Sequence, residues 1–237
     1  MLLMTLLNSP LSGQLKHDVI ETSSGELTIY FVGHGTLLFE FNDLAIHIDP
    51  VSREADYKTL PDADLILVTH QHGDHLDISA INELLKAGTE VVMTQKCLDQ
   101  LEDFDAVVMK NGDRRAIHGI GVEAVPAYNI EHVRPDGTPF HPKGEGNGYV
   151  LTFGSTRVLI GGDTENVPEL KKLKGIGVAF LPMNLPYTMD PEMVADVALA
   201  MRPEILYPYH FGNTDPQELV DLLKGEDDIE VRIRELQ

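Results

Sequence analysis

The sequence predicts an α/β protein in which two β-sheets pack face to face between outer helices, a four-layer αββα sandwich. Strand-like segments come first and amphipathic helical segments follow, once in about residues 1–115 and again in about residues 116–237. Sheets of this kind bury one face against each other and the other face under helices. No linker-like stretch interrupts the 237 residues, so we expect one domain made of two halves.

The first half is expected to begin with three antiparallel strands that are rich in β-branched and aromatic residues. They are residues 26–33, 36–41 and 42–50. Residues 63–70 form a continuous apolar run, which is typical of a strand buried on both faces. A helix capped by Asp77 and ended by Gly88 should follow, and then a strand at residues 90–94.

The second half repeats this order. Its expected strands are residues 121–127, 148–153, 157–163 and 177–183. Two later helices share a start signal, because Asp190 precedes Pro191 and Asp215 precedes Pro216. A capping carboxylate before a proline in the first turn favours helix initiation.

Charge and cysteine content exclude several classes of protein. The net charge of −20 repels phosphate backbones, so we expect no nucleic-acid partner. Cys97 is the only cysteine, so no disulfide forms within the chain, and we interpret it as a structural thiol. The apolar residues 1–10 are shorter than the ~20 residues of a membrane span. We therefore expect a strand or packed arm there, no membrane span, and a cytoplasmic protein.

The stretch "THQHGDHLD" places four residues of metal-ligand type within six positions, directly after the buried strand. They are His70, His72, Asp74 and His75. Side chains alternate along an extended segment, so His70 and His72 can share one side, and Gly73 allows a sharp turn before the other two. Imidazole and carboxylate groups suit zinc, iron or manganese. This spacing predicts a metal site.

Two further candidate ligands stand where strands end. "LIGGDTE" places Asp163 after an apolar strand and two glycines, and "ILYPYHFG" places His210 at the end of another strand. Residues carried at strand ends over a rigid sheet are well placed to build a site.

The order H-x-H-x-D-H, then "GD" at a strand end, then a late histidine resembles the metallo-β-lactamase superfamily. "FVGHGTLLFEF" and "AIHIDP" look like its branch of metal-dependent hydrolases containing N-acyl-phosphatidylethanolamine phospholipase D and ascorbate-phosphate lactonase. The resemblance covers about residues 26–215 and implies the αββα fold. It also implies a binuclear centre. The implied ligands are His70 and His72 for the first metal, Asp74, His75 and His210 for the second, and Asp163 bridging both.

The sequence departs from this family at one ligand. The family carries a metal-binding histidine shortly after the strand equivalent to residues 121–127, and here Asn129 stands in its place. An amide oxygen is a poorer zinc ligand than imidazole. His132 and His141 follow nearby, and we favour His141 because the proline and glycines after it resemble a shaped functional loop. If none of the three binds, the first metal is weak and the enzyme would work with one metal.

Four other residues are candidates near the chemistry. His34, between two glycines, has a catalytic or a packing role, and the resemblance places it near the metal centre. Asp49 either orients a ligand imidazole or forms an Asp-Pro turn. Tyr187, in a proline-held loop, and Lys143, a positive charge in an acidic chain, are candidate substrate-binding residues.

These residues predict a hydrolase that uses a metal-activated water on an ester, lactone or phosphodiester of a small molecule. Asp74, Asp163 and His34 are the candidate catalytic residues. We expect one or two divalent metals per chain, zinc first and manganese or iron as alternatives. The alternative functions are a non-catalytic metal-binding or sensor protein and a di-iron redox protein. The oligomeric state stays open.

Overall fold

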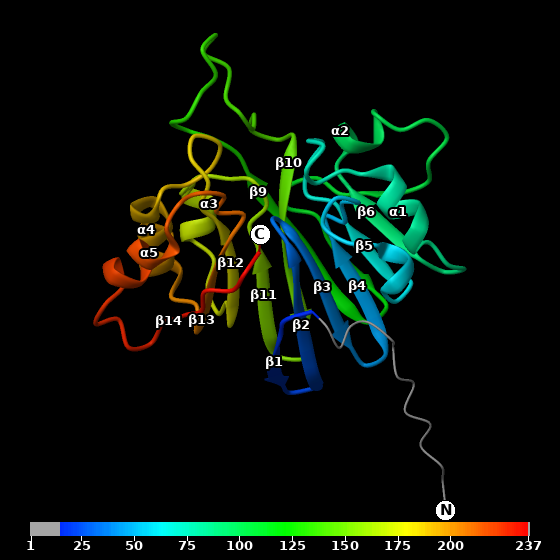
Figure 1. Ribbon diagram of the computed structural model, residues 1–237, viewed down its shortest axis with the longest axis horizontal. Helices are drawn as coiled ribbons and strands as arrows, with labels where there is room; N and C mark the ends of the chain where they lie inside the picture. Colours follow the sequence, from blue (N-terminus) through cyan, green and yellow to red (C-terminus); the bar gives the residue numbers. More distant parts are fainter. Residues whose placement is uncertain (1–14, 237) are drawn as a thin grey trace, which may run out of the picture.

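Two seven-stranded sheets form the centre of the computed structural model, which describes residues 15–236 (Figure 1). The first sheet contains β1 (His17–Thr22), β2 (Gly25–Gly33), β3 (Thr36–Phe41), β4 (Leu44–Ile48), β5 (Leu65–Leu67), β6 (Glu90–Met93) and β7 (Val107–Val108). The second contains β8 (Arg114–Ile117), β9 (Ile120–Ala127), β10 (Gly146–Phe153), β11 (Thr156–Ile160), β12 (Val178–Pro182), β13 (Ile205–Tyr209) and β14 (Glu230–Val231). In both sheets, neighbours in space are neighbours in sequence.

Both sheets change from antiparallel to parallel pairing halfway along. Strands β1 to β4 pair antiparallel and β4 to β7 pair parallel. Strands β8 to β11 pair antiparallel and β11 to β14 pair parallel. The carboxyl ends of parallel strands meet at one edge of a sheet, which is where α/β proteins place their sites. The loops after β4, β5, β11 and β13 leave from such ends.

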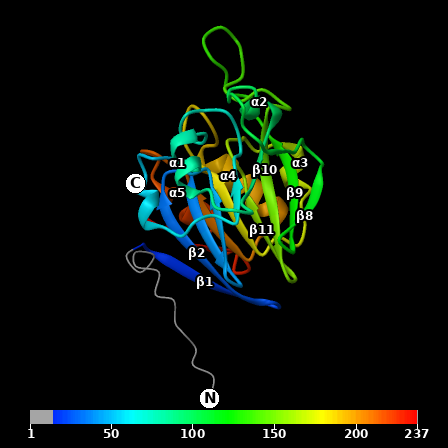
Figure 2. The same ribbon diagram turned by 90° about the vertical axis from the view of Figure 1, so that its right-hand side faces the viewer.

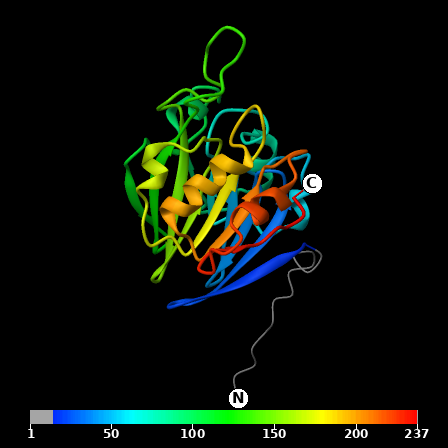
Figure 3. The same cartoon turned by 90° about the vertical axis from the view of Figure 1, so that its left-hand side faces the viewer.

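Helices cover the outer face of each sheet. The helices α1 (Ile78–Leu84) and α2 (Gln95–Leu98) lie over the first sheet (Figure 2). The second sheet is covered by α3 (Pro168–Lys171), α4 (Pro191–Met201) and α5 (Pro216–Leu222) (Figure 3). Asp77, Asp190 and Asp215 cap their helices as expected.

Three buried clusters fill the spaces between these layers. One lies between the two sheets and includes Phe39, Phe153 and Phe180. A second packs α3, α4 and α5 on the second sheet, and a third packs α1 and α2 on the first. Apolar side chains are thus buried on both faces of both sheets. The expected αββα sandwich is confirmed.

Some boundaries differ from the prediction. Helix α1 ends at Leu84 instead of Gly88, because Leu85 is extended and the Leu84 carbonyl accepts a hydrogen bond from the Ala63 N–H (2.9 Å). The strand predicted over residues 63–70 is shorter in the structure, where β5 spans only Leu65–Leu67. The sequence analysis missed several short elements, namely β1, β7, β8, β14, α2 and α3.

Residues 1–10, expected to form a strand or arm, lie outside the described residues. Within residues 15–236, no helix has the length and apolar character needed to cross a lipid bilayer.

Candidate metal centre

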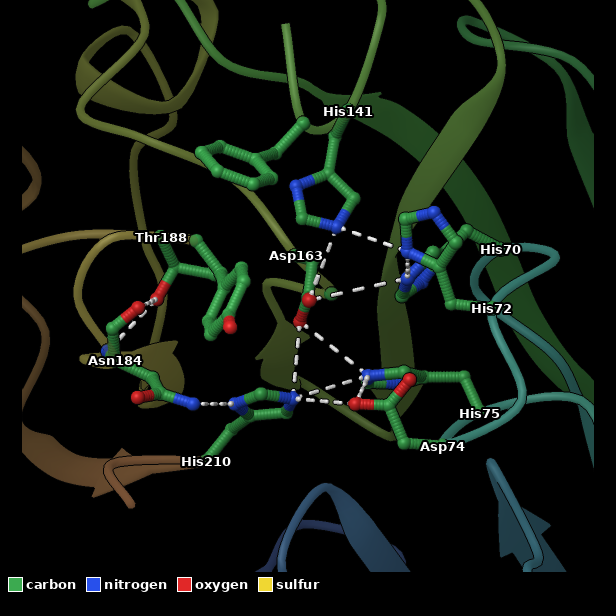
Figure 4. Close-up of polar contacts among 12 residues, drawn as sticks. His70, His72, Asp74, His75, His141, Asp163, Asn184, Thr188 and His210 are labelled. Carbon is green, nitrogen blue, oxygen red and sulfur yellow. Dashed lines mark hydrogen bonds and ion pairs between the residues drawn. The ribbon is translucent and has the colours of Figure 1, made fainter. Parts of the chain in front are cut away.

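The loop after β5 carries His70, His72, Asp74 and His75, whose side chains meet those of His141, Asp163 and His210 (Figure 4). A tight turn forms within it, in which the N–H groups of His75 and Leu76 both donate to the carbonyl of His72 (2.9 and 2.8 Å). His70 and His75 are buried, and their rings lie 4.1 Å apart between centroids. His70 and His72 lie on the side of His141, whereas Asp74 and His75 lie on the side of His210.

His70, His72 and His141 form what we call the first ligand group. His72 Nδ1 lies 3.0 Å from His70 Nε2 and 3.2 Å from His141 Nε2. His141 comes from the segment between β9 and β10, which projects from the top of the molecule in Figure 1. Three imidazole nitrogens from two distant segments thus converge on one point.

Asp74, His75 and His210 form what we call the second ligand group. His75 Nε2 lies 3.1 Å from His210 Nε2, and Asp74 Oδ2 lies 3.5 Å from His210 Nε2 and 3.8 Å from His75 Nε2. His210 follows β13 directly, so the end of that strand fixes its position.

Asp163 lies between the two groups and turns one oxygen toward each (Figure 4). Its Oδ2 is 3.1 Å from His141 Nε2 and 3.8 Å from His70 Nε2. Its Oδ1 is 3.4 Å from His75 Nε2 and 3.6 Å from His210 Nε2, and it is buried without a hydrogen bond. A buried carboxylate oxygen without a partner is costly unless a cation binds it.

The spacing of these atoms suits tetrahedral metal coordination. Metal–ligand distances of about 2.0–2.1 Å give tetrahedral edges of about 3.3 Å. Each group together with one Asp163 oxygen makes a quartet of donor atoms, and the nearest neighbours within each quartet lie 3.0 to 3.8 Å apart. The residues present therefore fit two ions that share Asp163.

The electrostatics of the site favour positive charge. Burial disfavours the ionised form of Asp163, but His210 and His75 hold its pKa well below the usual range. Burial and the neighbouring His75 hold the pKa of His70 well below its usual value, so this imidazole is neutral. Burial also acts against charge on His75, yet Asp163 and Asp49 raise its pKa to about 9. The ionised Asp163 carboxylate and the neutral His70 imidazole are donors of the kind that divalent transition metals bind.

Asp49 forms hydrogen bonds that hold two of the imidazoles, those of His75 and His70, in place. Its Oδ2 accepts hydrogen bonds from His75 Nδ1 (2.8 Å) and from Thr69 Oγ1 (2.7 Å), and its Oδ1 accepts from the Thr69 backbone N–H (2.7 Å). Since the Thr69 hydroxyl hydrogen goes to Asp49, Thr69 Oγ1 accepts from His70 Nδ1 (3.1 Å). Asp49 thus holds one imidazole directly and a second through Thr69. It is the orienting residue of the two alternatives that the sequence left open for it.

Local backbone geometry brings His34 close to the second group. His34, Asp49 and His210 all have left-handed φ values of 46° to 48°, a conformation that non-glycine residues adopt mainly where surrounding structure enforces it. His34 Nε2 lies 3.5 Å from Asp74 Oδ2. A Cβ on Gly35 would lie 3.0 Å from the His75 ring and 3.2 Å from the His210 ring, so any larger residue there would crowd both imidazoles.

A cavity of about 420 Å³ opens above the two groups. Among the residues that line it are His34, Arg53, Arg134, Phe140 and Tyr187. The Arg134 guanidinium lies over the Phe140 ring at 5.0 Å, and this ring meets Tyr187 edge-on at 5.1 Å.

Three candidates from the sequence analysis lie elsewhere. The Asn129 amide is not among the converging atoms, because its Oδ1 accepts from His141 Nδ1 (2.7 Å) instead. His132 Nδ1 pairs with Glu165 (2.8 Å). Lys143 Nζ binds Glu169 (2.7 Å), and Lys143 is not among the residues that line the cavity.

Sequence reasoning missed the residues that support the ligands. Thr69 stands beside His70, and its small hydroxyl next to a predicted ligand is the only signal that could have drawn attention to it. Glu165 is fully buried, and its pKa is lowered, although burial opposes this, by hydrogen bonds from Asn129 and from backbone N–H groups. A Glu two residues after the "GD" step gives no such indication.

Comparison with known proteins places the chain in a family. The model of the Beta-lactamase superfamily domain matches residues 28–210. The UPF0173 metal-dependent hydrolase TTHA1283 of Thermus thermophilus is 31% identical over 196 residues, which span 79% of this chain and 85% of that protein.

Two solved structures extend this comparison. A candidate metal-dependent hydrolase from Parabacteroides distasonis superposes with a TM-score of 0.89 at 48% identity, covering 94% of this chain and all of that one. Igni18, a metallo hydrolase from Ignicoccus hospitalis, shares the fold with a TM-score of 0.72 at 22% identity, covering 89% of this chain and 95% of that one. The chain therefore belongs to the beta-lactamase superfamily, in the branch of the UPF0173 metal-dependent hydrolases.

Proposed function

We propose that this chain is an enzyme that hydrolyses a small anionic ester, lactone or phosphodiester at a centre of two divalent metals. The observation that carries this proposal is the pair of donor quartets that share Asp163, with one of its oxygens turned to each. Membership of a family of metal-dependent hydrolases supports hydrolysis as the reaction type. Phosphoesterases and related hydrolases commonly use two neighbouring metals in this way.

Zinc is the metal we propose, with manganese or iron as alternatives that use the same donor atoms. His70, His72 and His141 with Asp163 Oδ2 would hold one ion. The second ligand group with Asp163 Oδ1 would hold the other. Divalent metal at such a site supplies Lewis acidity and lowers the pKa of a water molecule from 15.7 to about 7.

The remaining chemistry belongs to Asp74 and His34. A third of the Asp74 side chain is accessible, and its Oδ2 faces His34 Nε2 at 3.5 Å. His34 also lines the cavity. We assign Asp74 as the acceptor of the proton from the attacking water and His34 as the donor of a proton to the leaving oxygen.

The cavity wall opposite the ligands supports an anionic, partly apolar substrate. Arg53 and Arg134 bring positive charge to a protein whose net charge is −20. Within the described residues, Arg53 pairs with Glu54 (2.7 Å), whereas the Arg134 guanidinium donates one long hydrogen bond, to the Phe140 carbonyl (3.4 Å). We therefore assign the substrate anion to Arg134, and an apolar part of the substrate to Phe140 and Tyr187.

Metal content and activity test the proposal together. Protein loaded with zinc should hold close to two ions per chain by plasma mass spectrometry, and His141→Ala should hold one. Loaded wild type should hydrolyse at least one member of a panel of anionic esters, lactones and phosphodiesters. Asp74→Ala and His34→Ala should lower kcat on that substrate.

Two outcomes would contradict the proposal. Full metal loading without hydrolysis of any panel member would favour a non-catalytic metal-binding or sensor protein. Purified protein that holds iron with an EPR signal of a coupled pair would favour the redox alternative.

The buried single thiol of Cys97 suits a reducing compartment, so we propose the cytoplasm as the location.

A further inference from the structure

Asn129 is fixed in one orientation by its four hydrogen-bond partners. Its Oδ1 accepts from the backbone N–H of His141 (2.8 Å), and its Nδ2 donates to Glu165 Oε1 (2.7 Å) and to the Tyr187 carbonyl (2.9 Å). A backbone N–H can only donate, and a carbonyl can only accept. The amide therefore cannot be flipped without losing all of these bonds.

This orientation determines which nitrogen of His141 carries the hydrogen. His141 Nδ1 lies 2.7 Å from the same Asn129 Oδ1, so Nδ1 must donate to it. The lone pair is then on Nε2, which points at Asp163 Oδ2 (3.1 Å) and His72 Nδ1 (3.2 Å), as Figure 4 shows. A metal-binding imidazole needs this tautomer and this direction.

Glu165 anchors the chain of contacts at its far end. Its carboxylate is fully buried and accepts hydrogen bonds from three successive backbone N–H groups, those of residues 130 to 132 (2.7–2.8 Å). It also accepts from His132 Nδ1 and from the Asn129 amide. Since Glu165 is held by these donors, the position of Asn129 is determined by the backbone.

We propose that Glu165 and Asn129 are positioning residues that fix the tautomer and direction of the His141 imidazole and thereby set the metal affinity of the first ligand group. This rests on the function proposed above. The negative charge lies on Glu165, and the neutral amide transmits its effect to the imidazole. A carboxylate at residue 129 would instead face Glu165 at 2.7 Å, where like charges repel.

The test measures zinc affinity by competition with a chelator and counts the bound ions by plasma mass spectrometry. Asn129→Ala and Glu165→Gln should each lower the affinity for one of the two zinc ions by about 10- to 100-fold. This is the usual effect of removing a residue that hydrogen-bonds to a metal ligand. The other ion should remain at wild-type affinity, which also shows that the variant is folded.

Two variants serve as controls. Asn166→Ala removes the amide next to Glu165 in the sequence. This amide binds Asp196 (2.7 Å) and is not part of the relay, by which we mean the contacts from Glu165 through Asn129 to His141. His132→Ala removes one donor to Glu165 but leaves the contact between Glu165 and Asn129 in place. Both should keep two zinc ions at affinities close to wild type.

Different results would overturn the relay and the proposed function. The relay is wrong if Asn129→Ala and Glu165→Gln keep both ions at wild-type affinity while His141→Ala loses one. It is also wrong if these variants lose both ions equally, because neither residue contacts the second ligand group. If His141→Ala itself keeps two ions, the ligand set of the proposed function fails instead.

Discussion

The two ligand groups differ in what holds their imidazoles. In the second group, His75 Nδ1 donates directly to the carboxylate of Asp49 (2.8 Å). In the first group, His141 Nδ1 donates to the neutral amide of Asn129 (2.7 Å), and the carboxylate of Glu165 stands one step behind. Both arrangements select the same tautomer, but only the direct carboxylate strongly increases the basicity of the imidazole. The metal of the second group should therefore be bound more tightly.

The two supports also differ in where they come from. Asp49 directly follows β4, and Thr69, which binds it, follows the neighbouring β5, so the central sheet holds this support. Asn129 and His141 both belong to the segment between β9 and β10. The first group thus depends on the conformation of a loop, and the second depends on the core.

The largest expected effect comes from removing the residue that the two groups share. Asp163→Ala deletes one donor atom from each quartet, so the affinity for both metal ions should fall. Hydrolysis, measured as kcat/KM on the best panel substrate, should fall by on the order of 10³-fold. Activity and metal content close to wild type would show that the groups do not act through Asp163.

His47 gives a second comparison of partners, this time away from the metal. It is fully buried like His75, but its Nε2 faces a neutral acceptor, the Pro61 carbonyl (3.0 Å). Burial therefore lowers the pKa of His47 to about 4, whereas the carboxylates near His75 raise the pKa of that histidine to about 9.

This difference predicts how stability depends on pH. Between pH 6.5 and 4 the unfolded chain binds a proton at His47 that the folded chain does not, so stability falls as the pH falls. Urea unfolding at these two pH values should show about 3 kcal/mol less loss for His47→Gln than for wild type. Equal losses would mean that His47 takes up its proton in the folded state.

Asp49→Asn would make the second group resemble the first. The amide oxygen still accepts from His75 Nδ1, but the negative charge is lost, and the new NH2 group faces the Thr69 N–H that donates to Asp49 Oδ1 (2.7 Å). Zinc affinity of the second group should fall by about 10- to 100-fold, to a value near that of the first group. Competition with a chelator measures both affinities. If the difference in affinity between the two zinc ions stays the same, the charge of Asp49 does not explain it.

The smallest effect concerns the outer part of the projecting segment. Arg134→Ala should raise KM for an anionic substrate by about tenfold, the order expected for one charge-assisted hydrogen bond. Both zinc ions should stay bound. Lys143→Ala is the matched control, because its Nζ binds Glu169 and not the cavity, and it should leave KM unchanged.

Most of the proposed ligand residues could be predicted from the sequence because they lie next to a local signal. His70, His72, Asp74 and His75 share one short motif, and Asp163 stands at a strand end after two glycines. The sandwich was predictable for a similar reason, since its longer strands and helices have clear apolar periodicity. The strands β7 and β14 contain two residues each, too few to show any period.

The supporting contacts could not be predicted, because they join residues that no local pattern connects. Glu165 meets Asn129 across 36 positions of sequence, largely through backbone N–H groups that every residue has. The choice between His132 and His141 depended on the path of the same segment. Only the folded chain turns His132 toward Glu165 and His141 toward the ligands.

The projecting segment between β9 and β10 is held together at its base and ends in an exposed turn. Its base is pinned where the Asn129 N–H donates to the His141 carbonyl (2.9 Å), and a bridge joins Val133 to Pro139 further out. Beyond this bridge lies an exposed turn at Asp136 and Gly137. A fluorophore or a grafted recognition peptide at that turn would stand beside the cavity mouth without altering the ligand set. The fold thus offers a place where new substrate selectivity can be engineered separately from the chemistry.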